Sequence, residues 1–358
     1  MRTFLTTLSL LLATSAVFGQ QLPSELQTPE VVSVNRMPMR ASSFAFENKS
    51  LATKREKEKS EYFLTLNGQW KFNWVQDPRK RPDDFFKTDF DDSKWDNFKV
   101  PANWETNGYG LPIYVNQPYE FAGRKNTGAK MNPPFDIPVD NNPVGSYRKK
   151  FSLPQNWDGR QVFIHLGAVK SAFYIWINGK KVGYSEDSKL AAEFDITKYV
   201  KSGENLVALQ VYRWSDGSYL ECQDMWRISG IERDVYLYAT PKLDVRDFKA
   251  IATLDKSYKN GIFSLTAEID NYRIDKKTMH SKPDSFAVEL DLVDPKGKSV
   301  YKDETKGVKT VLGNFKSTVS FNAQVENVAA WTAETPNLYT LFITLKDKKG
   351  AVLEIIPQ

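Results

Sequence analysis

Alternation between apolar and polar residues dominates this chain from about residue 62 onward. In the run 173–177 the odd-numbered residues, which are Phe, Ile and Ile, would share one face of a strand, and Tyr174 and Trp176 would share the other. The pair Asn178 and Gly179 follows at once and favours the positive φ angles of a tight hairpin. Similar runs predict strands over 63–66, 70–75, 162–166, 173–177 and 206–212.

A second set of alternating runs begins near Pro241. Apolar residues occupy every second position in three runs, 263–269, 286–292 and 339–345. The segments 294–297 and 347–350 both begin with Asp and end with Gly, and they lie where hairpins would close. About a hundred residues with this spacing predict an immunoglobulin-like sandwich. No helix longer than a turn or two is predicted, so the expected fold class is all-β.

The first 19 residues follow the plan of a secretory signal peptide. Arg2 is the only charged residue, an apolar run covers 8–12, and small residues lead to Gly19. A membrane anchor is the alternative, but the apolar run is shorter than the roughly 18–20 residues that span a bilayer. We therefore expect cleavage near Gly19, no membrane span, and export to the periplasm or the extracellular space. Residues 20–60 have little periodicity and are predicted to form an extended lead on the surface.

Composition excludes some classes of function. Lys and Arg number 49 and Asp and Glu number 44 among 358 residues, with the two signs interleaved, so no basic stripe points to nucleic acid. Cys222 is the only cysteine and cannot form an intrachain disulfide. The two histidines, His165 and His280, lie too far apart in the sequence to predict a metal centre.

The stretch 213–235 has the composition of a sugar-binding loop, because aromatic side chains alternate there with charged ones. Asp216 precedes Gly217, so its carboxylate can stand at the tip of a turn and accept bonds from hydroxyls or bind a hard cation. An Asx-turn is the structural alternative. Trp214 and Trp226 would either stack on a sugar ring or pack internally, and we expect internal packing for both.

A second candidate lies in the proline-rich loop 101–142. Its Asn116 carries an amide that both donates and accepts hydrogen bonds, as a sugar hydroxyl does. The alternative is that Asn116 caps its own turn. Glu221 and Asp224 lie too close together on one loop to be interpreted as a glycosidase pair, and we expect them to bond to nearby arginines.

Many of these residues, taken in order, resemble the β-galactosidases of glycoside hydrolase family 2. The resembling segments include 66–72, 100–104, 112–116, 132–135, 142–145, 213–235 and 334–339. The resemblance implies a jelly-roll sugar-binding domain, here 61–240, and an immunoglobulin-like domain, here 241–358, ahead of a (β/α)8 barrel. It also implies that Asn116 contacts galactose hydroxyls and that Asp216 contacts the sugar while binding a sodium ion.

In that family two glutamates act as acid/base and nucleophile, and the resemblance implies that both, like the magnesium ligands, belong to the barrel. The sequence stops at Gln358, in the predicted last strand of the second sandwich, so no catalytic residue is assigned to it. We interpret the chain as the N-terminal part of an exported β-galactosidase. The expected partners are a galactoside substrate, a barrel domain or chain and, as an open alternative, a second copy in a homo-oligomer. A stand-alone carbohydrate-binding module is the competing interpretation.

Overall fold

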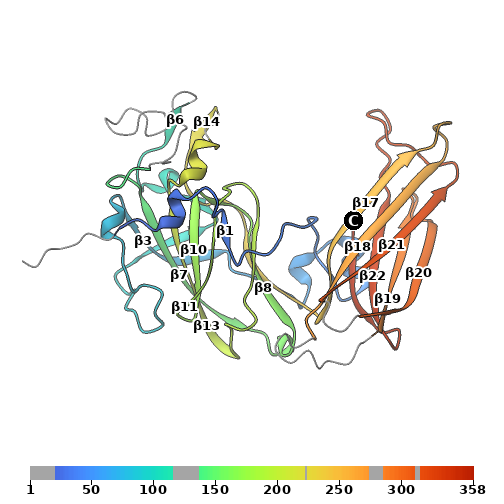
Figure 1. The fold of residues 1–358 in the computed structure, drawn as a ribbon, viewed down its shortest axis with the longest axis horizontal. Helices are drawn as coiled ribbons and strands as arrows, with labels where there is room; N and C mark the ends of the chain where they lie inside the picture. Colours follow the sequence, from blue (N-terminus) through green and yellow to red (C-terminus); the bar gives the residue numbers. More distant parts are fainter. Residues whose placement is uncertain (1–20, 116–136, 222–223, 274–284, 311–314) are drawn as a thin grey trace, which may run out of the picture.

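The computed structural model describes residues 21–115, 137–221, 224–273, 285–310 and 315–358, and it folds these into two β-sandwiches (Figure 1). The first sandwich has a seven-stranded sheet in the order β1 (Ser33–Val34), β11 (Lys180–Ser185), β10 (Ala172–Ile177), β13 (Gly203–Tyr212), β7 (Val144–Leu153), β3 (Gly68–Val75) and β4 (Asp96–Val100). Its four-stranded sheet has the order β12 (Ala192–Asp195), β8 (Gln161–Leu166), β16 (Val235–Thr240) and β2 (Phe63–Thr65).

Strand β10 shows how the sequence pattern produces the core. Phe173, Ile175 and Ile177 pack between the two sheets, whereas Tyr174 and Trp176 pack on the other face of the larger sheet. Asn178 and Gly179, with φ angles of 50° and 81°, then turn the chain into β11. The predicted facing and the predicted hairpin are both confirmed.

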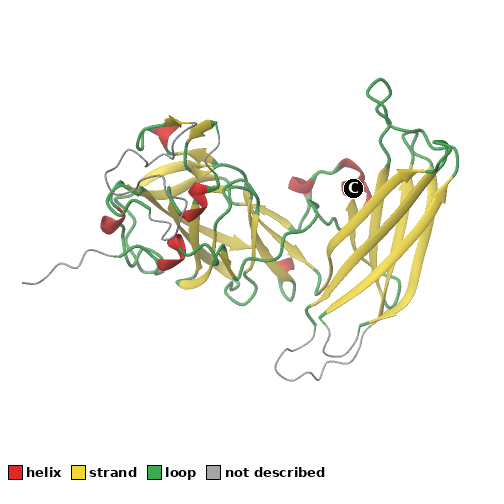
Figure 2. Cartoon of the chain, turned by 45° about the horizontal axis from the view of Figure 1, so that its top comes forward, coloured by secondary structure: helices red, strands yellow, loops and turns green. Residues whose placement is uncertain are grey.

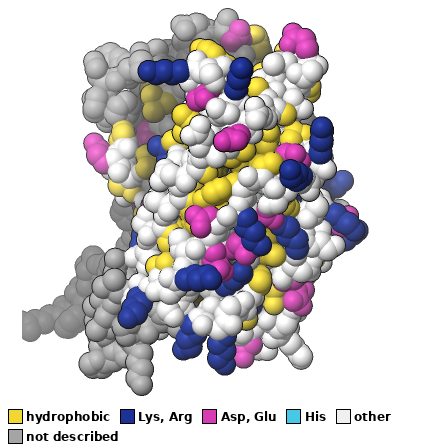
Figure 3. All heavy atoms as spheres, turned by 90° about the vertical axis from the view of Figure 1, so that its right-hand side faces the viewer, with side chains coloured by type: hydrophobic (Ala, Val, Ile, Leu, Met, Phe, Trp, Pro, Cys, Tyr) yellow, Lys and Arg dark blue, Asp and Glu magenta, His cyan; other side chains and the backbone are white. Residues whose placement is uncertain are grey.

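The second sandwich pairs a three-stranded sheet with a four-stranded one (Figure 2). The first has the order β17 (Leu243–Leu254), β18 (Gly261–Asn271) and β21 (Lys316–Val325), and the second has the order β20 (Ser299–Lys309), β19 (Ser285–Val293), β22 (Thr340–Asp347) and β23 (Val352–Pro357). The alternating residues predicted to face inward, such as Leu265, Leu290 and Ile343, are fully buried in its core. On the face seen in Figure 3, acidic and basic side chains are interspersed with hydrophobic ones.

The described part of the lead is anchored more firmly than its sequence indicates. Strand β1 extends the larger sheet of the first sandwich, and Phe46 forms a bridge to Ile355 of the second. Leu26, Phe46 and Ala52 are buried. The short helices of the described residues are η1 (Ser24–Gln27), α1 (Lys49–Lys54), η2 (Lys57–Lys59), η3 (Pro78–Lys80), η4 (Glu105–Asn107), η5 (Gln155–Trp157) and η6 (Asp216–Tyr219). With α1 as the one α-helix among the described residues, the all-β fold class is confirmed.

Two small sheets hold the long loops at one end of the first sandwich. They are formed by β5 (Ala102–Asn103), β15 (Gly230–Ile231) and β9 (Val169–Lys170), and by β14 (Met225–Arg227) and β6 (Ile113–Val115). Gly230 has a φ of 120°, and a Cβ atom there would lie 2.7 Å from the carbonyl oxygen of Ala102. Only glycine therefore allows this close approach of the two loops.

Candidate functional site

Asp216 begins η6, the short helix that follows β13. Ser215 caps this helix, because its side chain and that of Ser218 bond reciprocally to each other's backbone N–H groups. Asp216 is 6% exposed, and its Oδ2 atom has no hydrogen-bond partner among the described residues. A buried carboxylate oxygen without a partner is costly, so an Asx-turn alone does not explain the position of Asp216.

Glu186 lies beside Asp216. Its Oε2 atom would be 3.3 Å from a Cβ atom on Gly217, and its Oε1 atom accepts a hydrogen bond from the hydroxyl of Tyr184. Burial, together with the charge of Asp216, raises the pKa of Glu186 to about 9. Burial also raises the pKa of Asp216. At neutral pH a protonated Glu186 can donate to Asp216, which leaves a negative charge on Asp216 for a hydroxyl or a hard cation.

We expect Glu186→Gln to flatten the pH dependence of stability between about pH 5 and 8. The folded chain keeps a proton on Glu186 up to about pH 9, whereas the unfolded chain loses it near 4.5. The folded state therefore binds more protons in this window, and the free energy of unfolding falls as the pH rises, by at most about 1.4 kcal/mol per pH unit. Glutamine cannot ionise, so this component disappears.

Urea unfolding at several pH values checks the expectation. Glu204→Gln is the matched control, because Glu204 is exposed and its ion pair with Lys150 is exposed as well; this variant should keep the slope of the original protein. An unchanged slope in Glu186→Gln would show that Glu186 is ionised in the folded state.

A two-stranded ribbon of β6 and β14 stands beside this site at the top of the first sandwich in Figure 1. Tyr114 and Trp226 face each other across it, with ring centroids 5.7 Å apart, and are 53% and 56% exposed. Leu111, Leu220 and Met225 are also exposed. The expectation of internal packing is wrong for Trp226, which stays more than half exposed on the ribbon. It is right for Trp214, which is 4% exposed.

Arg213 connects the ribbon to the Asp216 loop. Its Nη2 atom donates to the carbonyl oxygens of Leu111 and Arg227, each at 3.0 Å. Its Nη1 atom lies 3.5 Å from the buried carboxylate of Glu105, which in turn accepts from the backbone N–H of Ser229. One guanidinium thus fixes the start of β6 and the end of β14 next to the chain that carries Asp216.

The other predicted site residues have different outcomes. Asn116 lies outside the described residues, directly after β6. The carboxylate of Glu221 accepts from the backbone and hydroxyl of Ser188, and Asp224 accepts from Tyr114. Within the described residues these carboxylates therefore bond to Ser188 and Tyr114 instead of to arginines as expected, and Arg227 donates to the carbonyl oxygen of Glu221. Glu186 was not predicted, and its only sequence signal is an acid at the end of an apolar strand.

Both sandwiches match models of known protein families. Residues 63–241 match the sugar binding domain of glycosyl hydrolases family 2, and residues 243–358 match a further domain of glycosyl hydrolases family 2. The chain belongs to glycoside hydrolase family 2.

Curated relatives are much longer than this chain. A β-galactosidase of Priestia megaterium is 39% identical over 332 residues, which cover 93% of this chain and 31% of the relative. A β-galactosidase of Halalkalibacterium halodurans is 40% identical over 335 residues, which cover 94% of this chain and 31% of that relative. The chain therefore spans about a third of the length of these relatives.

Solved structures share the fold. A β-glucuronidase of Bacteroides uniformis aligns with a TM-score of 0.63 at 23% identity, over 82% of this chain and 31% of that one. No helix in the described part of the chain is long and apolar enough to cross a membrane. Nor do the described residues contain a group of three or more His, Cys, Asp or Glu side chains arranged to hold a metal ion.

Proposed function

We propose that this chain is the N-terminal part of an exported β-galactosidase and that it contributes sugar contacts to an active site completed by a barrel domain. The observation that carries the proposal is the buried carboxylate of Asp216, which has an unsatisfied oxygen, beside an exposed aromatic ribbon in a sugar-binding domain. The names of the relatives that are 39% and 40% identical support the choice of galactosides as substrates.

In this proposal Asp216 accepts hydrogen bonds from galactose hydroxyls, and Asn116 both accepts hydrogen bonds from them and donates to them. The unpartnered oxygen of Asp216, with the carboxyl group of Glu186 beside it, is a hard oxygen donor set that fits a sodium ion. Asp216 would hold this ion, which would supply a positive charge to a sugar oxygen. The two catalytic glutamates and the magnesium ligands are proposed to belong to the barrel.

The exposed ribbon supports a barrel as partner. Three exposed apolar side chains lie on the ribbon, as is common at protein contact sites: Tyr114, Met225 and Trp226. Because Arg213 fixes the ribbon to the Asp216 loop, a barrel that covers the ribbon would meet the sugar contacts in a defined position. Export is proposed from residues 1–19, which lie outside the described part of the structure.

Activity in a mixture tests the proposal. We expect the purified chain, mixed with a separately expressed barrel fragment of a family relative, to hydrolyse a chromogenic β-galactoside. Asp216→Asn should lower kcat/KM by roughly 10–100-fold, because a hydrogen bond to a charged group is worth about 1.5–3 kcal/mol. Asp158→Asn, an exposed acid at the end of η5, is the matched control.

Two results would overturn parts of this proposal. Equal activity of Asp216→Asn and Asp158→Asn would remove Asp216 from the sugar contacts. An inactive mixture, with galactose binding to the chain alone that Asp216→Asn abolishes in calorimetry, would identify a carbohydrate-binding module instead of an enzyme part.

A further inference from the structure

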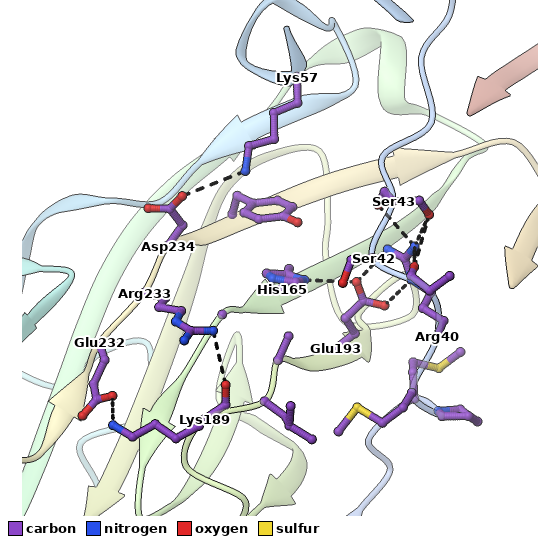
Figure 4. A pocket seen from close by; sticks show the side chains of 18 of the residues that line it. Arg40, Ser42, Ser43, Lys57, His165, Lys189, Glu193, Glu232, Arg233 and Asp234 are labelled. Atoms are coloured by element: carbon purple, nitrogen blue, oxygen red, sulfur yellow. Dashed lines mark hydrogen bonds and ion pairs between the residues drawn. The ribbon is translucent and has the colours of Figure 1, made fainter. Parts of the chain in front are cut away.

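A cavity of about 620 Å³ lies over the outer face of the four-stranded sheet of the first sandwich (Figure 4). Its floor is formed by His165 of β8, Glu193 of β12 and Tyr236 of β16, and the lead segment 37–43 forms one wall. Neither Asp216 nor any residue of the ribbon lines it. The cavity is therefore separate from the proposed galactose site.

The floor of the cavity is electrostatically satisfied. Glu193 accepts two hydrogen bonds from Arg40, at 2.8 and 2.9 Å, and one from Arg246 at 2.9 Å. His165 Nδ1 lies 3.1 Å from the same carboxylate. Figure 4 shows this group on one side of the cavity, opposite Arg233 and Lys189. A ligand would gain little by competing for Glu193.

The rim carries a cation without a carboxylate partner. Lys189 pairs with Glu232, and Lys57 lies 3.9 Å from Asp234. Arg233 instead donates one hydrogen bond, from Nη1 to the carbonyl oxygen of Lys189 at 3.3 Å, and has no ion pair among the described residues. Four cationic side chains and three carboxylates line the cavity in all. The lining therefore carries one more positive than negative charge, and this excess lies on Arg233. The remaining N–H groups of the Arg233 guanidinium match a ligand that carries a single carboxylate.

The remaining lining indicates what kind of molecule would carry that carboxylate. Ser42 and Ser43 offer hydroxyls, and Met39 and Leu190 offer exposed apolar surface, which together match the hydroxyl edge and the C–H face of a sugar ring. Tyr236 is buried between His165, at 4.4 Å, and the ammonium of Lys57, at 4.7 Å, so it is not available to stack on a nucleotide base. The lining also contains too many charges for a lipid chain.

We propose that this cavity is a second carbohydrate site, which binds a sugar with one carboxylate, such as a hexuronate, with that carboxylate on Arg233. The proposal is independent of the galactosidase assignment, because it uses none of the residues assigned to the galactose site.

Calorimetric titration of the full chain with galacturonate, galactose and acetate, at matched ionic strength, tests this site. Galacturonate should bind more tightly than galactose and acetate. Arg233→Gln should weaken galacturonate binding by about tenfold or more, as expected for loss of a charge-assisted hydrogen bond. Arg79→Gln is the matched control, because Arg79 is an exposed arginine on η3 that does not line the cavity; it should leave the affinity unchanged, as should Asp216→Asn.

Several outcomes would overturn the proposal. Equal binding of acetate and galacturonate would identify a general anion site. Equal binding of galactose and galacturonate, or an affinity that Arg233→Gln leaves intact, would remove the role of the carboxylate. Loss of galacturonate binding in Asp216→Asn would place the sugar at the other site, and no binding at all would exclude a second site.

Discussion

Replacing Arg213 with methionine is expected to destabilise the chain by about 3–5 kcal/mol, the usual cost of removing one partner of a buried ion pair. Arg213 and the carboxylate of Glu105 are both buried. Without the guanidinium, Glu105 would be an uncompensated buried charge, and the carbonyl oxygens of Leu111 and Arg227 would each lose a donor. Urea unfolding at neutral pH measures the loss.

Two further variants separate charge from packing. Lys150→Met removes an exposed lysine whose partner is also exposed, and should cost less than about 1 kcal/mol. The double variant Arg213→Met with Glu105→Gln should recover part of the loss, because it leaves no buried charge while the amide oxygen can still accept from Ser229. If Arg213→Met lowers the free energy of unfolding no more than Lys150→Met does, the ion pair between Arg213 and Glu105 does not stabilise the loops.

The loss of stability in Arg213→Met should also depend on pH. Burial raises the pKa of Glu105, and the charge of Arg213 opposes that rise. Without Arg213 the folded pKa of Glu105 should increase further, so the folded variant would retain a proton that the unfolded chain loses. The stability difference between the variant and the original protein should therefore grow as the pH rises above the unfolded value of 4.5.

The core strands could be predicted from the sequence because their pattern is local. The inward positions of β10, β18 and β19 follow directly from alternation, and the hairpin turns follow from Asn-Gly and Asp-to-Gly segments. The identity of the first unit as a jelly roll came from resemblance to a family, whereas the spacing of the alternating runs had already indicated an immunoglobulin-like second unit. Alternation alone does not fix the order of strands in a sheet.

The candidate site was predicted less completely because its contacts are not local. Tyr114 and Asp224 are 110 residues apart, and their bond depends on the pairing of β6 with β14. The neighbours Glu186 and Asp216 follow two different strands of the larger sheet, whose positions only the folded sheet determines. Trp214 is buried and Trp226 exposed for the same reason, since Trp214 packs in a core cluster of the first sandwich and Trp226 lies on the ribbon of β6 and β14.

Replacing Glu193 with glutamine is also expected to cost about 3–5 kcal/mol, because it removes the carboxylate that pairs with the buried Arg246 and the partly buried Arg40. Arg40 comes from the lead, His165 from the first sandwich and Arg246 from the second, so the carboxylate of Glu193 joins three parts of the chain. Although burial alone would raise it, the hydrogen bond from His165 and the two guanidiniums hold the pKa of Glu193 well below its usual value. Glu204→Gln, at an exposed ion pair, is the matched control.

The pH range of the effect distinguishes this variant from Arg213→Met, whose deficit grows above pH 4.5, whereas the deficit of Glu193→Gln develops below it. Because the folded pKa of Glu193 is depressed, its stabilising contribution is present above the unfolded pKa of 4.5 and is lost as the pH falls through the folded pKa. The stability difference between Glu193→Gln and the original protein should therefore be greatest near neutral pH and shrink in acid. Calorimetry should also resolve two unfolding transitions in the variant, since the bond between Glu193 and Arg246 that couples the two sandwiches is weakened. A single transition and a pH-independent difference would show that Glu193 contributes packing rather than charge.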